Sequence, residues 1–242
     1  MSSATVEVPS PSGTLTFMDS AYQTPTWNNY NSAYLTIGGT TEARSAGTYT
    51  ATFTPIAPYA TWTDGSSDTK NVNWTIERAT ISTPYLVDTN VFTYTGDTII
   101  PQFIGYNSQK MSRGGTTAAV NVGHYEATFT PYENYQWPGG DTGTIGVGWH
   151  IVKASASLSL SKESLYIGPY SATGSITVTR DGNGAISASS SDTSVATVSV
   201  SGNTVTVTKV GKGSATITVS VAEDTYYAAA SKTFKVSCST RR

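Results

Sequence analysis

One part of this chain occurs twice, and the spacing between the copies constrains the fold more than any other feature. The segments that match at a spacing of 75 or 76 residues are Gly38-Gly39-Thr40-Thr41 and Gly114-Gly115-Thr116-Thr117, Ala51-Thr52-Phe53-Thr54-Pro55 and Ala127-Thr128-Phe129-Thr130-Pro131, and Trp74-Thr75-Ile76 and Trp149-His150-Ile151. A period this long indicates a repeated domain rather than a solenoid unit. Repetition of one small domain usually serves length and display.

The repeat predicts three small domains in the 242-residue chain. We expect a first repeat over residues 1–79, a second repeat over residues 80–154 and a third segment over residues 155–242. Each copy ends on its Trp-x-Ile strand, which is followed by Glu77-Arg78-Ala79 or by Val152-Lys153-Ala154. Connectors this short leave few residues free to bend, so a stiff string of domains is expected.

Alternation of apolar and polar residues with period two predicts β-strands throughout. In the first repeat Tyr49, Ala51 and Phe53 point to one face while threonines point to the other. In the third segment valines and threonines alternate on both sides of Ser201-Gly202-Asn203, which predicts a tight hairpin. Helical periodicity is weak, and Gly or Pro recurs at short intervals. The predicted fold class is all-β, with small sandwich domains.

The repeats carry a resemblance to a known family. Their shared pattern is a Gly-Gly-Thr-Thr turn, a Gly-x-Tyr-x-Ala-x-Phe strand, an aromatic hairpin and a closing Trp-x-Ile strand. The residues that supply it are Gly47, Tyr49, Ala51, Phe53, Trp62, Trp74 and Ile76, and then Gly123, Tyr125, Ala127, Phe129, Trp137, Trp149 and Ile151. This pattern resembles the bacterial Ig-like modules of the MBG type.

The third segment resembles a different module, the group-2 bacterial Ig-like domain of the invasin and intimin type. The residues that carry this resemblance are Asp192-Thr193-Ser194-Val195-Ala196-Thr197-Val198, Gly202, Val205-Thr206-Val207, Gly211 and Gly213-Ser214-Ala215-Thr216-Ile217. The two resemblances imply a string of three small Ig-like β-sandwich domains, as found in phage virion proteins and bacterial surface proteins. Neither implies an activity.

Composition excludes several functional classes. Only 12% of residues are charged and the formal net charge is −2, so nothing in the chain would attract nucleic acid electrostatically. No apolar run approaches the roughly 20 residues that a membrane-spanning helix needs, so membrane insertion is not expected.

Cys238 is the single cysteine and has no partner for an intramolecular disulfide. It is either a chance residue at a strand end or the site of an intermolecular bridge.

Residue types that could support catalysis or metal binding are few and scattered. His124 and His150 stand where the first repeat has Thr48 and Thr75, which places both on the solvent face of a strand. No further His, Cys or carboxylate ligands occur near them at a suitable spacing, so we predict no metal site and no catalytic residue. Asp181-Gly182-Asn183-Gly184 is similar to half a calcium loop, but the same letters are strong hairpin-turn signals. No cofactor is expected.

The aromatic residues are the weak candidates for ligand binding. Tyr132, Tyr135 and Trp137 cluster in one hairpin and could stack on a glycan. Tyr59 and Trp62 occupy the corresponding hairpin of the first repeat, which favours packing of the hairpin onto the sheet instead. Both interpretations stay open at this point.

These observations predict a non-enzymatic structural or display protein of a bacteriophage virion. Its partners would be other virion proteins of the capsid or tail and host surface carbohydrate.

The N-terminal residues 1–13 lack a basic region and an apolar region, which argues against export by a signal peptide. The Ser- and Pro-rich residues 1–12 are either an arm that adds a strand to a neighbour's sheet or a frayed terminus. The alternatives are a fragment of a bacterial cell-surface adhesin and, ranked lower, a polysaccharide-binding accessory module.

Overall fold

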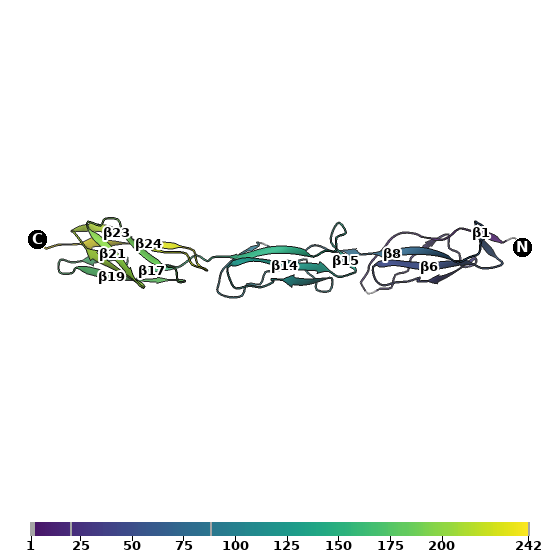
Figure 1. The fold of residues 1–242 in the computed structure, drawn as a ribbon, viewed down its shortest axis with the longest axis horizontal. Helices are drawn as coiled ribbons and strands as arrows, with labels where there is room; N and C mark the ends of the chain where they lie inside the picture. The colour runs from purple at the N-terminus through teal and green to yellow at the C-terminus, as the bar shows by residue number, and fades with distance from the viewer. Residues whose placement is uncertain (1–2, 20, 88, 242) are drawn as a thin grey trace. The chain divides into compact units, whose positions relative to one another are not determined.

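The computed structural model describes residues 3–19, 21–87 and 89–241, and over these residues it contains β-strands and no helix (Figure 1). The chain divides into two compact units. Unit 1 comprises residues 1–87, 102–115 and 127–147, and unit 2 comprises residues 88–101, 116–126 and 148–242. The division between the units passes through the second repeat, and the boundaries at residues 79 and 154 stay predictions. The all-β fold class is confirmed.

The strands of unit 1 are β1 (Ala4–Val6), β2 (Ser10–Pro11), β3 (Leu15–Thr16), β4 (Trp27–Asn28), β5 (Leu35–Gly39), β6 (Gly47–Pro55), β7 (Ala60–Trp62), β8 (Lys70–Glu77), β9 (Ala79–Thr80), β10 (Tyr85–Leu86), β12 (Phe103–Ile104), β13 (Met111–Gly115) and β15 (Tyr135–Gln136). Residues of β14 (Gly123–Pro131) and β16 (Ile145–Val152) belong to both units. The strands of unit 2 are β11 (Val91–Thr93), β17 (Leu158–Leu160), β18 (Ser164–Ile167), β19 (Thr173–Arg180), β20 (Ile186–Ser190), β21 (Ala196–Ser201), β22 (Thr204–Lys209), β23 (Gly213–Val221) and β24 (Ala230–Cys238).

The first repeat is built on a four-stranded sheet in the order β3-β8-β6-β5. Strands β6 and β8 run side by side in Figure 1 and pair antiparallel, with Tyr49 opposite Trp74. Ala51 and Phe53 are fully buried, and Trp27 packs its ring edge-on against Phe53. The alternation predicted from the sequence is therefore confirmed, because its apolar side forms the core of this repeat.

The backbone conformation explains the second glycine of the repeated Gly-Gly pair. Gly39 and Gly115 end the matching strands β5 and β13 with φ values of 71° and 67°, a left-handed conformation that residues with a side chain rarely adopt. A Cβ atom on Gly39 would also lie 2.7 Å from the carbonyl oxygen of Thr50. Only glycine satisfies both conditions at residue 39, and the left-handed φ value favours glycine at residue 115 as well.

The third segment is a β-sandwich. One sheet has the order β17-β19-β22-β21 and the other has the order β18-β24-β23-β20. The two sheets share a single apolar core, to which Ile176 and Val205 contribute from the first sheet and Ile217 and Phe234 from the second. The predicted hairpin is confirmed: β21 and β22 pair directly around Gly202, whose φ is 56°.

Strand β1 lies in a position that the sequence did not reveal. Ala4, Thr5 and Val6 pair in parallel with Ala60, Thr61 and Trp62 of β7, and Val6 packs against the core of the first repeat. These residues complete their own module, so the arm for a neighbour's sheet and the frayed terminus are both wrong for residues 4–6, while residues 1 and 2 lie outside the described residues.

Candidate functional site

The aromatic hairpin of the second repeat does not form an exposed platform. Trp137 is 2% exposed, and its Nε1–H donates a hydrogen bond of 2.8 Å to the carbonyl oxygen of Gly143. Tyr135 is also buried, whereas Tyr132 is 45% exposed. A ring that is buried offers no face to a sugar, so the candidate glycan contact by Tyr135 and Trp137 is not supported by their placement. Only Tyr132 remains available at the surface.

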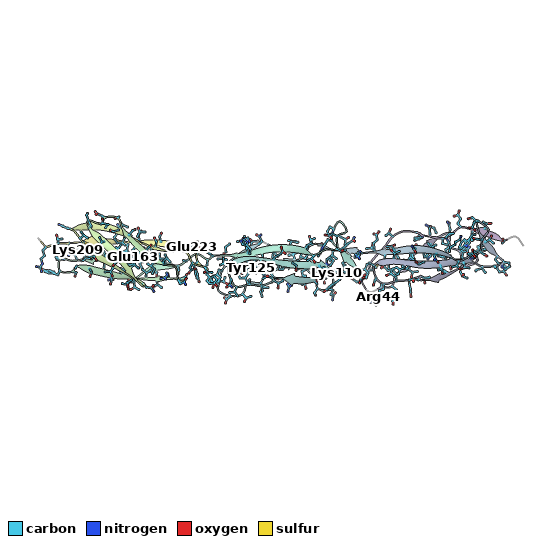
Figure 2. All side chains as sticks on the ribbon, in the orientation of Figure 1. Arg44, Lys110, Tyr125, Glu163, Lys209 and Glu223 are labelled. Atoms are coloured by element: carbon cyan, nitrogen blue, oxygen red, sulfur yellow. The ribbon has the colours of Figure 1, made fainter. Side chains whose placement is uncertain are left out.

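Tyr135 instead joins the two repeats within unit 1. Phe17 of the first repeat packs edge-on against its ring at a centroid distance of 5.4 Å. The Tyr135 hydroxyl donates a hydrogen bond to the carboxylate of Asp19, and Lys110 (labelled in Figure 2) pairs with the same carboxylate at 3.8 Å. Burial, and then the hydrogen bond to Asp19, raises the pKa of the Tyr135 hydroxyl to about 12. The ring therefore stays a neutral hydrogen-bond donor at physiological pH.

Backbone groups complete this first junction. The connector residues Ala79 and Thr80 form β9, which pairs in parallel with β15 of the second repeat. The side-chain oxygen of Asn134 accepts a hydrogen bond of 2.8 Å from the Ala46 N–H, and its carbonyl oxygen accepts one of 3.0 Å from the Ala79 N–H. Arg78 donates from Nε to the carbonyl oxygen of Glu133 at 2.8 Å. Ala79 and Thr80 therefore form a strand paired with the next module, and Arg78 before them is also hydrogen-bonded to that module.

The junction after the second repeat, within unit 2, is made in the same way. Ala154 forms a parallel bridge with Tyr227, and its N–H donates to the carbonyl oxygen of Tyr226 at 2.9 Å. The ring of Tyr226 stacks on Tyr94 at a centroid distance of 4.4 Å and an interplanar angle of 17°. The Tyr226 hydroxyl also donates to the side-chain oxygen of Asn121 at 3.0 Å.

The sequence contained a signal for the first junction that the spacing of the repeats alone did not show. Ala4-Thr5-Val6 pairs with β7 as Ala79-Thr80 pairs with β15, and in both cases the alanine N–H donates to a backbone carbonyl of the hairpin. The segments Ala4-Thr5-Val6 and Ala79-Thr80-Ile81 share the pattern Ala-Thr-aliphatic. This short pattern marks the strand that enters each repeat.

Hydrogen bonds between carboxylates and backbone amides hold the turn Asp181-Gly182-Asn183-Gly184 in place. Asp181 accepts a hydrogen bond from the N–H of Ser157 at 3.0 Å. Asp224 accepts bonds from the N–H groups of Asn183 at 2.7 Å and of Tyr226 and Tyr227 at 2.8 Å each. These contacts tie the turn to the loop of the second junction, which supports the turn interpretation over the calcium loop.

Acid is expected to weaken the loop that contains Asp224. The hydrogen bond from the Asn183 amide, followed by those from Tyr226 and Tyr227, lowers the pKa of Asp224 below 3.8. A carboxyl whose pKa is lower in the folded state stabilises the fold above its unfolded pKa, and this contribution is lost as pH falls through the lowered value. The difference in urea midpoint between the wild type and Asp224→Asn should therefore be constant above about pH 5 and shrink in more acidic buffer. A difference that does not change with pH would contradict the assignment.

Cys238 lies at the end of β24 with 5% exposure, inside the core of the sandwich. Burial raises the pKa of its thiol. A buried and protonated thiol is a poor nucleophile for disulfide exchange, so the intermolecular bridge is not favoured.

The two histidines are brought together in unit 2. Their ring centroids are 5.1 Å apart, and His124 is exposed while His150 is half-buried. Among the described residues, no group of three or more His, Cys, Asp or Glu side chains is arranged to hold a metal ion. None of the described segments forms a helix of the length and apolarity needed to cross a membrane.

Comparisons with known proteins return no family model and no curated protein that matches the chain. Solved structures do match. Domains 4 and 5 of the S-layer protein SbsC align over 57% of this chain and 81% of that chain, at 20% identity and a TM-score of 0.29. A three-Ig segment of titin aligns over 98% and 96% at 8% identity and a TM-score of 0.35. Drosophila N-cadherin aligns over 100% and 99% at 7% identity and a TM-score of 0.32. The MBG-type and group-2 resemblances stay predictions.

Proposed function

We propose that this chain is a non-enzymatic structural and display protein of a bacteriophage virion, in which tandem β-sandwich modules serve as a spacer. The observation that supports this most directly is the construction of the junctions. Ala79-Thr80 and Ala154 each connect one module to the next and at the same time pair with a strand or loop of that next module. A connector that is hydrogen-bonded in this way loses most of its freedom to bend.

Side chains add to this stiffness at both junctions. In unit 1 a buried tyrosine, Tyr135, contacts the first repeat through its ring and its hydroxyl. In unit 2 the stacked pair Tyr94 and Tyr226 has the same role, and Lys153 pairs with Glu223 at 3.0 Å. The exposed ion pair contributes little, so the aromatic contacts are the main side-chain component. Stiff junctions suit a protein that holds one end away from its anchoring surface.

The second junction can be tested directly. Tyr226→Ala removes an aromatic pair worth about 0.5–1.5 kcal/mol and the hydrogen bond to Asn121. Amide 15N relaxation of this variant should then give residues 155–242 a rotational correlation time different from that of β11 and the strands beside it. In the wild type both parts should have the same correlation time. Tyr170→Ala is the matched control, because Tyr170 lies in the same unit at 82% exposure. Unchanged relaxation in Tyr226→Ala would contradict the stiff junction.

The virion setting rests on the resemblance to bacterial Ig-like modules, which occur in phage virion proteins and in bacterial surface proteins. The same junctions would serve a fragment of a bacterial cell-surface adhesin. The location of the protein, on phage particles or on the cell wall, therefore distinguishes the virion role from the adhesin role. Mass spectrometry of purified particles, with the cell-wall fraction analysed in parallel, provides the test. We expect the protein in particles at a fixed ratio to the capsid protein. Its presence in the wall fraction and absence from particles would exclude the virion role.

Contact with host surface glycans would rest on the exposed tyrosines of the hairpins. Tyr132 is 45% exposed and Tyr59 of the first repeat is 59% exposed. A single exposed ring binds a sugar weakly, but many copies on one particle convert weak contacts into adhesion. A Tyr59→Ala and Tyr132→Ala double variant should therefore lower particle adsorption without changing incorporation. Equal adsorption of both particles would remove the glycan part of the proposal.

A further inference from the structure

The chain has only two histidines, and the fold places them side by side. His124 lies on β14 and His150 on β16, which are neighbours in one sheet. Their rings are 5.1 Å apart between centroids and inclined by 35°. We propose that this His124–His150 pair binds one divalent ion of a late first-row transition metal, namely copper, nickel or zinc.

The spacing of the rings fits such an ion. A metal bonded to one nitrogen of each of two imidazoles at about 2.0–2.1 Å, in tetrahedral geometry, places the two ring centroids about 5 Å apart. The observed centroid distance of 5.1 Å matches this separation, so rotation of the two rings, without movement of the strands, is what would bring one nitrogen of each to a common ion. The exposed position of His124 also gives an ion access from solvent.

The backbone beneath the pair is held in place by the core. Trp149 precedes His150, is 1% exposed, and donates from Nε1 to the carbonyl oxygen of Thr116 at 2.9 Å. Tyr125 follows His124, and its ring packs against Trp149 at 4.8 Å. The His150 N–H donates to the carbonyl oxygen of Asn90 at 2.8 Å. Because the two strands are already fixed, binding an ion would order little more than the imidazole rings.

The donor set selects the class of metal. Neutral imidazole nitrogen suits copper, nickel and zinc, whereas calcium and magnesium require several oxygen ligands. The described residues offer no third His, Cys, Asp or Glu in a suitable group, so water would fill the remaining positions. Glu126 lies two residues beyond His124 on the exposed side of β14, and its carboxylate adds negative charge near the cation. The affinity should follow the usual order, with copper bound more tightly than zinc.

The first repeat provides an internal comparison. Thr48 and Thr75 occupy the matching positions, face each other across β6 and β8, and have their Oγ1 atoms 3.3 Å apart. The same sheet is therefore formed with a pair of hydroxyl groups, which are weak ligands for these metals. The histidines are not needed for the fold, and the threonines define substitutions that the sheet already tolerates.

Titration calorimetry of the full chain without an affinity tag tests the proposal, with copper and zinc salts as probes. We expect one ion per chain for the wild type and loss of that step in His124→Thr, in His150→Thr and in the double variant. The thermal midpoint of the wild type should also rise with zinc, because the ion binds only the folded state, while that of the double variant should not. A wild type that binds neither ion, or binding that survives in the double variant, would overturn the proposal.

Transfer of the pair to the first repeat gives a second, independent outcome. A Thr48→His and Thr75→His variant should bind two ions per chain instead of one. The electron paramagnetic resonance spectrum of bound copper should show coupling to two imidazole nitrogens at each site. Coupling to only one nitrogen would contradict the proposal, and so would the failure of the Thr48→His and Thr75→His variant to bind a second ion. Either result would show that two adjacent imidazole rings in a sheet of this kind do not form a metal site.

Discussion

Trp74→Ala is expected to lower the free energy of unfolding of the first repeat by about 3–5 kcal/mol. Trp74 is 2% exposed, and its ring packs against Tyr49 at a centroid distance of 5.0 Å. Its Nε1–H donates to the carbonyl oxygen of Thr40 at 2.7 Å. Alanine would leave a cavity in a small core and remove the hydrogen bond to Thr40, and both changes destabilise the folded state.

Hydrogen exchange of the amides in β6 and β8 is the appropriate measurement, because a chain with two compact units need not unfold in one step. Thr75→Ala is the matched control on the same strand. Thr75 is exposed, so its loss should change the local stability by no more than about 0.5 kcal/mol. If Thr75→Ala cost as much as Trp74→Ala, the core would not depend on this tryptophan.

Trp74→Phe separates the two contributions. Phenylalanine keeps an aromatic ring against Tyr49 but has no donor for the carbonyl oxygen of Thr40. We expect a loss smaller than that of alanine, to which the lost hydrogen bond contributes about 0.5–1.5 kcal/mol. Trp149 in the second repeat makes the same hydrogen bond to Thr116, so the matching variants there should rank in the same order.

The core of the fold could be predicted because it is carried by local alternation. Ala51 and Phe53 recur as Ala127 and Phe129, and all four are fully buried. A period-two pattern specifies which side chains share a face before any partner strand is known. The same reasoning placed both histidines on the solvent side; the exposure of His124 confirms this, while His150 is half-buried.

Contacts between strands could not be predicted in this way, because they depend on register. The histidines are 26 residues apart in the chain, and their proximity follows from the pairing of β14 with β16. Alternation assigns each residue to a face but does not say which residue lies opposite. The match to Thr48 and Thr75 could have indicated the pair only if the register of β6 and β8 had been known.

The aromatic hairpin shows a second limit. Tyr132, Tyr135 and Trp137 look alike in the sequence as possible stacking surfaces, yet only Tyr132 is exposed. The orientation of Trp137 is determined by a hydrogen bond to Gly143, and that of Tyr135 by Asp19, which is 116 residues away in the chain. Partners at such distances are absent from any local pattern, so burial of these rings required the structure.

Gly39→Ala is expected to lower the free energy of unfolding of the first repeat by about 2–4 kcal/mol. The φ value of Gly39 is 71°, where a Cβ atom strains the backbone. The added methyl would also lie 2.7 Å from the carbonyl oxygen of Thr50 and 3.1 Å from the amide nitrogen of Thr52. These are backbone atoms of the paired strand and cannot rotate away, so either β5 or β6 must shift and its ladder must weaken.

Gly148→Ala is the control that makes this result specific, because the same methyl group is added to a strand glycine with open space around it. No atom lies within 4 Å of a Cβ built on Gly148. Alanine there reduces the conformational freedom of the unfolded chain, which should leave stability unchanged or raise it by up to about 1 kcal/mol. Local stability measured by hydrogen exchange should therefore fall in β5 for Gly39→Ala and stay the same or rise in β16 for Gly148→Ala. If both variants lost stability equally, alanine would be unfavourable in these strands in general. The geometry of the Gly-Gly-Thr-Thr turn would then not explain its glycine.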